Sequence, residues 1–248
     1  MTFYVNDTGG NGVNPGAANV DSREIAKFEA LAHRWWDPDG DFKPLHDINP
    51  VRVAYIAGRC AIAGQPVIDI GCGGGILTES LAGLGADVTG IDMAEGPLTV
   101  AKLHAFETGC TDVRYELATP EAFAAVEPER FELVTCLEML EHVPDIQSTI
   151  DALARLAAPG GHIVLSTINR HPKAYALAVI GAEYVLNLLP RGTHDYQKFI
   201  KPSELASAVR NAGLSPVEIR GLRYNPFTRR ASLSDDVDIN YMLYATKP

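Results

Sequence analysis

The sequence lacks several patterns that would place it in a particular class of protein. Its four cysteines form no CxxC pair, which argues against a zinc site or a redox dithiol and indicates reduced thiols. No apolar run reaches the roughly 18 residues of a membrane-spanning helix. The N-terminus resembles neither a secretory signal nor an arginine-rich presequence. A cytoplasmic location is therefore expected.

Basic residues are few in this chain. Its 248 residues include 21 Lys and Arg against 31 Asp and Glu, so the formal net charge is −10. An acidic protein repels a phosphate backbone, so no nucleic acid partner is expected. Apolar residues make up 46% of the chain, which is enough for a buried core, and the length suits one large α/β domain.

The N-terminal part predicts a tail followed by a helical cap. Residues 1–20 are rich in Gly and Asn and are expected to be flexible. Asp21 is a suitable N-cap, and Glu24 follows three residues later, as in a capping box. The elements expected in the cap, residues 21–65, are a helix from Asp21 to about Asp37, a loop over 42–49 and a second helix over 51–63.

Beyond residue 65, short apolar strands alternate with helices, which indicates parallel strands covered on both faces. The expected strands are residues 67–70, 88–92, 113–117, 131–136, 162–167, 217–223 and 240–246. The expected helices are residues 77–84, 98–108, one carrying Leu153 and Leu156, and 202–212. Residues 171–200 do not fit this alternation and are expected to be an insertion after the fifth strand.

A glycine-rich turn follows the first of these strands. Gly71 and Gly73 belong to a run that opens a helix, where backbone N–H groups are free to meet a cofactor. The third glycine of a dinucleotide GxGxxG motif would fall on Ile76, and Asp69 would place a carboxylate beside a pyrophosphate, so an NAD(P) dehydrogenase is disfavoured. A cationic sulfonium cofactor tolerates that carboxylate. Asp92 ends the second strand, where an acid can accept bonds from ribose hydroxyls. The alternative is a turn needed only for tight packing.

Several longer stretches carry a more specific resemblance. The chain resembles class I S-adenosylmethionine-dependent methyltransferases and, within them, the ubiquinone biosynthesis O-methyltransferase family. The glycine loop alone indicates only the superfamily. The stretches that carry the family resemblance are FEALAHRWWD (28–37), FKPLHDINPVR (42–52), VIDIGCGGGILTESLA (67–82), TCLEMLEHVPD (135–145), GTHDYQKFIKPSEL (192–205) and INYML (239–243).

The resemblance implies a fold, a reaction and a cofactor site. The fold is a single doubly wound, Rossmann-like α/β domain over residues 21–248, mostly parallel with an antiparallel strand near the C-terminus. The reaction is methylation of phenolic hydroxyls on polyprenylated catechol and demethylubiquinol, and a ubiquinone biosynthetic complex is a candidate partner. S-adenosylmethionine is expected to contact Arg52, Gly71, Asp92 and Leu137, with Asp69 and Gly73 in the same pocket. For Arg52, the residue type alone would indicate only a surface charge.

Glu138, Glu141 and His142 follow the fourth strand at i, i+3 and i+4, a spacing that predicts one helical face. Two carboxylates and an imidazole can hold a divalent ion such as Mg²⁺ or Zn²⁺, which would lower the pKa of a bound catechol, and eukaryotic members of the family point to such a metal. Without a metal, His142 is the candidate general base. The third alternative is a purely structural role at a helix N-terminus.

The insertion is apolar over residues 174–190, apart from Glu183 and Asn187. An apolar helix with basic ends can lie in a membrane interface and meet anionic lipids, where a prenylated substrate resides. A buried helix over the active site gives the same pattern. The basic flanking residues are Arg170, Lys173, Arg191, Lys198 and Lys201.

Two alternatives to this function remain at the level of sequence. One is a class I methyltransferase that acts on another small phenol or carboxylate, for which an apolar insertion would be superfluous. The other is a methyltransferase-like scaffold without activity, against which the retained glycines and Asp92 argue. Trp35 lies on an apolar helical stripe and is expected to be a core residue rather than a substrate contact.

Overall fold

The computed structural model describes residues 19–110, 112–175 and 195–248. Most of the expected tail and the apolar centre of the insertion therefore lie outside the described residues. The expected boundary of the tail at residue 20 is wrong by at least two residues, because the fold already includes Asn19. Asn19 is buried, and its amide donates hydrogen bonds to Glu121 Oε1 at 2.7 Å and Thr149 Oγ1 at 2.9 Å. These bonds make Asn19 part of the folded domain.

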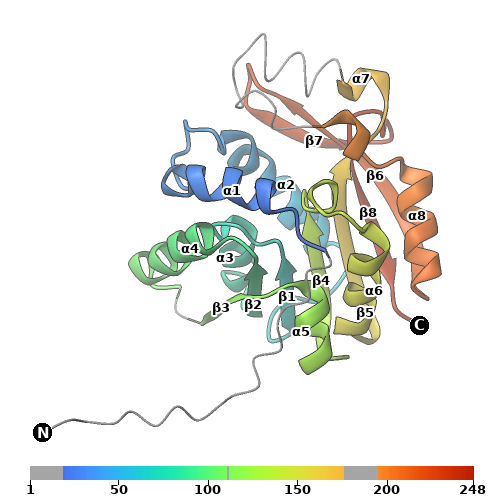
Figure 1. Cartoon of the computed structure of the whole chain (residues 1–248), viewed down its shortest axis with the longest axis horizontal. Helices are drawn as coiled ribbons and strands as arrows, with labels where there is room; N and C mark the ends of the chain where they lie inside the picture. Colours follow the sequence, from blue (N-terminus) through green and yellow to red (C-terminus); the bar gives the residue numbers. More distant parts are fainter. Residues whose placement is uncertain (1–18, 111, 176–194) are drawn as a thin grey trace, which may run out of the picture.

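An eight-stranded sheet forms the centre of the molecule, in the order β3-β2-β1-β4-β5-β8-β6-β7 (Figure 1). The first five strands pair in parallel, and β8 is antiparallel to both β5 and β6. The expected α/β fold class is thereby confirmed. The strands are β1 Pro66–Ile70, β2 Asp87–Asp92, β3 Val113–Leu117, β4 Phe131–Leu137, β5 Ala157–Ile168, β6 Ser215–Asn225, β7 Arg230–Ser234 and β8 Asn240–Thr246.

Helices cover both faces of the sheet (Figure 1). One core joins α5, α6 and α8 to the sheet, and a second core on the opposite face joins α2 and α3 to it. The α-helices are α1 Ser22–Leu31, α2 Lys43–Ala57, α3 Ile76–Ala82, α4 Glu95–Thr108, α5 Pro120–Val126, α6 Ile146–Leu156, α7 Pro172–Ala174 and α8 Pro202–Asn211. Short 3₁₀ turns are η1 Ala32–Arg34, η2 Leu140–His142 and η4 Tyr196–Lys198.

The helical cap differs from the sequence expectation. The loop expected over residues 42–49 is instead the first half of α2. Pro44 lies in the first turn of this helix, where its missing N–H is not needed, so it does not exclude a helix. Pro50 lies inside the helix and is tolerated there. Prolines near both ends of a segment were therefore a poor reason to expect a loop.

Two further elements were not expected from the sequence. Helix α5 begins with Thr119, whose side chain accepts a hydrogen bond from the Ala122 backbone N–H at 3.2 Å, and Pro120 follows in the first turn. These are regular N-terminal features that the sequence displays. Strand β7 pairs with β6 as an antiparallel hairpin at the edge of the sheet. Its five residues alternate, with Ala231 and Leu233 packed against the core, but two apolar side chains in so short a run are a weak signal for a strand.

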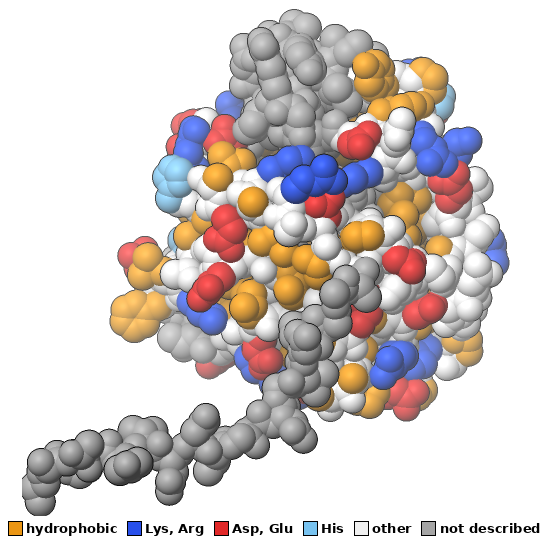
Figure 2. Space-filling model, in the orientation of Figure 1, with side chains coloured by type: hydrophobic (Ala, Val, Ile, Leu, Met, Phe, Trp, Pro, Cys, Tyr) orange, Lys and Arg blue, Asp and Glu red, His pale blue; other side chains and the backbone are white. Residues whose placement is uncertain are grey.

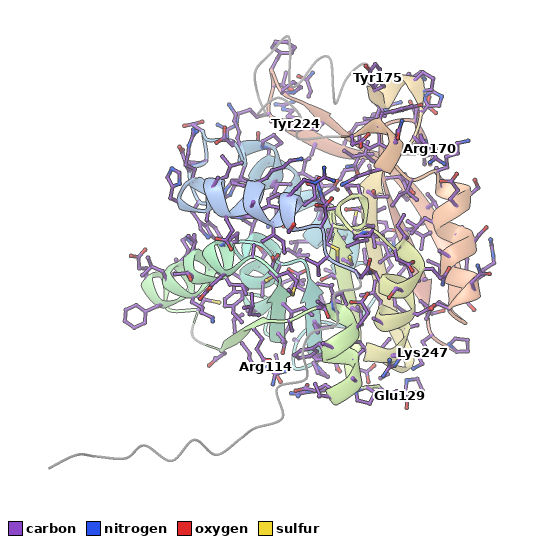
Figure 3. The ribbon with its side chains drawn as sticks, in the orientation of Figure 1. Arg114, Glu129, Arg170, Tyr175, Tyr224 and Lys247 are labelled. Carbon is purple, nitrogen blue, oxygen red and sulfur yellow. The ribbon has the colours of Figure 1, made fainter. Side chains whose placement is uncertain are left out.

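Different labelled side chains lie at the two opposite ends of the molecule. Figure 3 shows Arg114, Glu129 and Lys247 at one end of the molecule and Arg170, Tyr175 and Tyr224 at the other. The space-filling view shows apolar side chains near the centre of one face, with basic side chains beside them (Figure 2).

Among the helices of the described residues, none is both long and apolar enough to cross a bilayer.

Candidate active site

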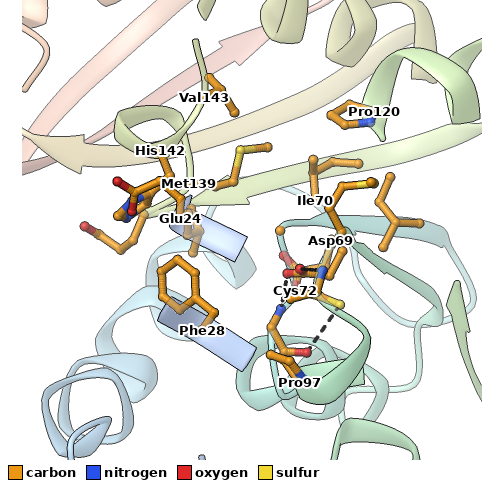
Figure 4. A pocket seen from close by; sticks show the side chains of 18 of the residues that line it. Glu24, Phe28, Asp69, Ile70, Cys72, Pro97, Pro120, Met139, His142 and Val143 are labelled. Atoms are coloured by element: carbon orange, nitrogen blue, oxygen red, sulfur yellow. Dashed lines mark hydrogen bonds and ion pairs between the residues drawn. The ribbon is translucent and has the colours of Figure 1, made fainter. Parts of the chain in front are cut away.

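A cavity lies at the carboxyl ends of β1, β2 and β4, where ligands bind in open α/β sheets (Figure 4). Helix α1 lies over the cavity and contributes Glu24 and Phe28 to its lining. All but one of the site residues expected from the sequence line this cavity: Arg52, Asp69, Gly71, Gly73, Asp92, Leu137, Glu138 and His142. The exception is Glu141, which is buried outside the lining.

The glycine loop packs tightly against the helical cap. Gly71 and Gly73 have φ of 68° and 53°, in the left-handed region that favours glycine. A Cβ atom at Gly73 would lie 2.1 Å from Cζ2 of Trp35. The neighbouring Trp36 donates a hydrogen bond from Nε1 to the Gly74 carbonyl oxygen at 2.9 Å. Trp35 is buried, so its expected core role is confirmed, and the same ring also lines the cavity beside the loop.

Two carboxylates flank this loop. Asp92 accepts hydrogen bonds from the backbone N–H groups of Gly73 and Ala94, both at 2.8 Å, which fixes the carboxylate at the end of β2. Burial raises the pKa of Asp92 despite these bonds. Asp69 is buried and accepts hydrogen bonds from the hydroxyls of Thr78 and Thr135, both at 2.7 Å. Burial raises the pKa of Asp69 to about 6.

Arg52 is buried on α2, so it is not a surface charge. Its Nη2 donates to Glu138, which balances the two charges. Its Nε is also buried and has no hydrogen-bond partner among the described residues. A buried guanidinium N–H without a partner costs free energy, and a carboxylate ligand at the cavity would satisfy it. The site therefore fits a cofactor that carries a carboxylate.

Glu138, Glu141 and His142 do not share one helical face, and that expectation is wrong. Glu138 leaves β4 with a φ of 54°, and only the three-residue turn η2 follows. The reversal separates the three side chains, so each finds different partners. Glu138 accepts hydrogen bonds from Ser166 Oγ at 2.7 Å and from the Asn240 amide, and Glu141 accepts one from Thr167 Oγ1 at 2.8 Å.

The electrostatics of the two glutamates differ. Burial alone would raise the pKa of Glu138, but the charge of Arg52 and hydrogen bonds from Asn240 and Ser166 bring it below its usual value. Burial, reinforced by the charge of Glu138, raises the pKa of Glu141 to about 7. One glutamate is thus held as an anion against an arginine, whereas the other titrates close to neutral pH.

This donor set does not fit a divalent metal as it is arranged. The carboxylate of Glu138 is engaged by Arg52, and that of Glu141 is turned to Thr167. No group of three or more His, Cys, Asp and Glu side chains within residues 19–110, 112–175 and 195–248 is placed to hold a metal ion. The residues present therefore do not support a metal-dependent step of the reaction.

His142 faces the cavity next to α1. Its Nδ1 lies 3.1 Å from Oε2 of Glu24, and its ring meets Phe28 edge-on, with centroids 5.2 Å apart (Figure 4). The hydrogen bond with His142, opposed by burial, holds the pKa of Glu24 well below its usual range. Sequence reasoning assigned Glu24 only to a capping box. In the structure Asp21 alone caps α1, and Glu24 turns toward a residue 118 positions away.

Comparisons with known proteins agree with this site. A methyltransferase domain matches residues 49–219. A solved structure of magnesium protoporphyrin IX methyltransferase from Synechocystis PCC 6803 with bound SAM superposes with a TM-score of 0.62 at 20% identity, over 91% of this chain and 97% of that chain. A SAM-dependent methyltransferase from Thermotoga maritima gives a TM-score of 0.63 at 14% identity, over 91% and 99%. At this identity the two structures show the shared fold alone.

Curated relatives are far more similar in sequence. The ubiquinone biosynthesis O-methyltransferase of Stutzerimonas stutzeri is 62% identical over 230 residues, which is 93% of this chain and 99% of the relative. That of Pseudomonas entomophila is 62% identical over 226 residues, 91% of this chain and 97% of the relative. Because these matches span almost the whole chain, it belongs to the ubiquinone biosynthesis O-methyltransferase family.

Proposed function

We propose that this protein transfers the methyl group of S-adenosylmethionine to phenolic hydroxyls of polyprenylated catechol and demethylubiquinol in ubiquinone biosynthesis. Family membership supports the reaction. The observation that carries the proposal is one continuous cavity, lined by the glycine loop and Asp92 on one side and by His142 on the other. A cofactor held by the loop would thus share a cavity with a group that can accept a proton.

The cofactor-binding residues act through fixed dipoles and charges. The carboxylate of Asp92, already oriented by two backbone N–H groups, accepts hydrogen bonds from the ribose hydroxyls. The unpaired Nε of Arg52 donates to the cofactor carboxylate. Leu137 lines the cavity at the end of β4, where a backbone contact does not depend on its side chain.

His142 acts as the general base in this proposal. Bound S-adenosylmethionine supplies a methyl group whose bond to sulfur breaks as the bond to the acceptor oxygen forms. A neutral phenol is a poor nucleophile, so its proton must leave as the oxygen attacks. With Nδ1 bonded to Glu24, Nε2 of His142 is the ring nitrogen that can take this proton and pass it to solvent.

The apolar lining supports a prenylated acceptor. Ile25, Phe28, Met139 and Val143 line the cavity around His142. We infer that the prenyl chain leaves the site along these side chains, and that the insertion at residues 171–200 meets a membrane interface. The protein would then be cytoplasmic and peripherally membrane-associated, and a ubiquinone biosynthetic complex remains a proposed partner.

The basic residues that flank the insertion offer less free charge than the sequence suggests. Arg170 pairs with Glu204, Lys173 pairs with Asp238, and Lys198 pairs with Asp21 and Glu24. For these three of the five flanking basic residues, the ion pairs reduce the positive charge that is offered to anionic lipids. The proposed interfacial contact therefore depends on the apolar residues of the insertion more than on its charged ends.

Vesicle co-sedimentation tests this contact. Wild-type protein should sediment with vesicles that contain anionic lipid, and Leu186→Glu with Leu189→Glu should abolish the binding, because two charges enter the apolar stretch. Leu103→Glu with Phe106→Glu is the matched control, since these exposed apolar residues lie on α4, outside the insertion. Equal sedimentation of wild type and the insertion variant would refute the interfacial contact.

Methyl transfer to a short-chain prenylated catechol tests the reaction itself. Turnover with S-adenosylmethionine is expected, with a higher kcat/KM than for the same catechol without its prenyl chain. Equal kcat/KM for the two acceptors would favour a methyltransferase of another small phenol. Binding of S-adenosylmethionine without turnover on either acceptor would contradict the proposed substrate class.

The same assay with EDTA tests whether methyl transfer depends on a divalent metal ion. Turnover should survive the chelator, because the three candidate ligands have other partners in the structure. Loss of turnover that Mg²⁺ or Zn²⁺ restores would show that Glu138, Glu141 and His142 rearrange around an ion.

A further inference from the structure

Glu24 occupies an unusual place for a carboxylate on a surface helix. It lies in the first turn of α1, yet only 8% of the residue is exposed. A buried carboxylate requires partners that compensate for its lost hydration. Its position at the helix start accounts for part of its stability, since the helix dipole favours acids there. The dipole does not explain why the side chain turns away from the helix and into the site.

Both oxygens of this carboxylate are engaged by different elements. Oε2 lies 3.1 Å from Nδ1 of His142, and Oε1 accepts a hydrogen bond from Nζ of Lys198 at 3.0 Å. Lys198 belongs to η4, near the end of the insertion, whereas His142 belongs to η2, after β4. The carboxylate is therefore fixed in position and in rotation by two elements distant in sequence.

The orientation of the His142 imidazole is also fixed by two contacts, one with Glu24 and one with Phe28. Phe28, one turn after Glu24 on α1, packs edge-on against the ring at an interplanar angle of 85°. An ionised carboxylate can only accept, so it selects the tautomer with the proton on Nδ1. Nε2 then carries the lone pair, and it has no hydrogen-bond partner within the described residues, although His142 lines the cavity.

We propose that Glu24 is a positioning residue for methyl transfer: it fixes the tautomer and orientation of His142 so that the lone pair of Nε2 faces the acceptor hydroxyl. The inference rests on the proposed function, in which His142 takes the acceptor proton. Glu24 itself touches neither cofactor nor acceptor in this role. It acts only through the imidazole, as the aspartate of a Ser-His-Asp triad orients its histidine.

The tautomer can be measured without any turnover. In ¹⁵N-edited NMR spectra of the seven histidines at pH 8, the His142 signals are assigned by their loss in His142→Gln. Wild type should show a protonated Nδ1 and an unprotonated Nε2. Glu24→Ala should shift the ring toward the Nε2–H form that a free imidazole prefers. An unchanged tautomer in Glu24→Ala would overturn the inference.

Steady-state kinetics give the second readout. Glu24→Ala should lower kcat roughly ten- to hundredfold, because a misplaced base loses much of its contribution, while the Kd for S-adenosylhomocysteine stays within about twofold of wild type. Glu24→Asp keeps the charge and should recover part of kcat. Loss of kcat and cofactor affinity together, with a lowered thermal midpoint, would indicate a structural role and overturn the inference.

Glu29 provides a matched control on the same helix. Its carboxylate also accepts a long-range bond, from the Gly96 backbone N–H at 2.9 Å, but it does not line the cavity. Glu29→Ala should leave both kcat and the His142 tautomer unchanged. If the wild type itself failed to methylate the prenylated catechol, the proposed substrate would be wrong, and the NMR experiment would still decide whether Glu24 sets the tautomer.

Discussion

Arg52 combines a buried ion pair with a free N–H at the cavity, so it should contribute directly to cofactor affinity. Arg52→Gln is expected to raise the Kd for S-adenosylhomocysteine roughly ten- to hundredfold, because a charge-assisted hydrogen bond is worth about 1.5–3 kcal/mol. Isothermal titration calorimetry measures this change. Arg59→Gln is the control, since Arg59 follows directly after the end of α2 but pairs with Glu218. Equal affinity of wild type and Arg52→Gln would mean that Arg52 serves only to balance Glu138.

Asp69 links pH to stability. Its pKa is raised to about 6 in the folded protein, above its usual value in an unfolded chain. Because the folded protein binds the proton of Asp69 more tightly than the unfolded chain does, Asp69 contributes its full stabilisation below about pH 4. This stabilisation is lost as the pH rises through about 6. Relative to Asp69→Asn, wild type should therefore lose on the order of 3 kcal/mol of unfolding free energy between pH 4 and pH 7.5.

Urea unfolding at both pH values measures this difference. Asp87→Asn is a suitable control, because Asp87 is exposed at the start of β2. A constant difference between wild type and Asp69→Asn across this pH range would show that burial does not shift the titration of Asp69.

At the scale of elements, the packing of the cap on the glycine loop should be needed for cofactor binding. Gly73→Ala places a methyl group where Trp35 lies and keeps a residue at positive φ. Gly109→Ala shares the positive φ, but its added methyl group meets nothing within 4 Å. Both variants should lose about 1–2 kcal/mol from backbone strain. Only Gly73→Ala should also lose more than tenfold in cofactor affinity, measured by titration calorimetry. Equal losses in the two variants would mean that the contact with Trp35 is unimportant.

The same elements show what sequence could and could not predict. Strands β1 to β4 fell within a residue of their expected bounds, because β1, β2 and β4 are short buried apolar runs and the edge strand β3 alternates apolar with polar residues. The glycine loop and Asp92 could be predicted to lie together, because each directly follows or ends one of two consecutive parallel strands, β1 and β2, whose carboxyl ends meet at the same edge of the sheet. The first half of α2 differs from the expected loop, because a proline in the first turn is compatible with a helix and gives the same local sequence signal as a loop.

The part of the site that escaped prediction is made by distant residues. Nothing near Glu24 in the sequence indicates that it meets His142 and Lys198, since the partners are 118 and 174 positions away. The spacing of Glu138, Glu141 and His142 suggested a helix, but the positive φ of Glu138 breaks that geometry. A left-handed glutamate has no signature in a single sequence, because glycine and asparagine are the usual residues there.

At the scale of the whole molecule, the C-terminal part of the chain holds the N-terminal cap in place. The β6–β7 hairpin reaches α2 through Tyr224, whose hydroxyl donates to Asp47 at 2.7 Å. Arg229 in the same hairpin donates to Asp47 and to Asp39. Closer to the start of β6, Glu218 accepts a hydrogen bond from the hydroxyl of Tyr55 on α2 at 3.0 Å. The N-terminal cap, the sheet and the C-terminal hairpin thus share contacts rather than forming separable units.

This arrangement predicts that the folded part of the chain, which begins no later than Asn19, unfolds as one domain. Differential scanning calorimetry should show a single transition, because loss of the C-terminal hairpin would expose α2 and open the cavity beneath it. S-adenosylhomocysteine at about 100 times its Kd should stabilise the folded protein by about 2.7 kcal/mol and raise the midpoint by roughly 5–10 °C, still as one transition. A separate early transition that the ligand abolishes would show that the cap unfolds by itself, and that binding orders it over the glycine loop.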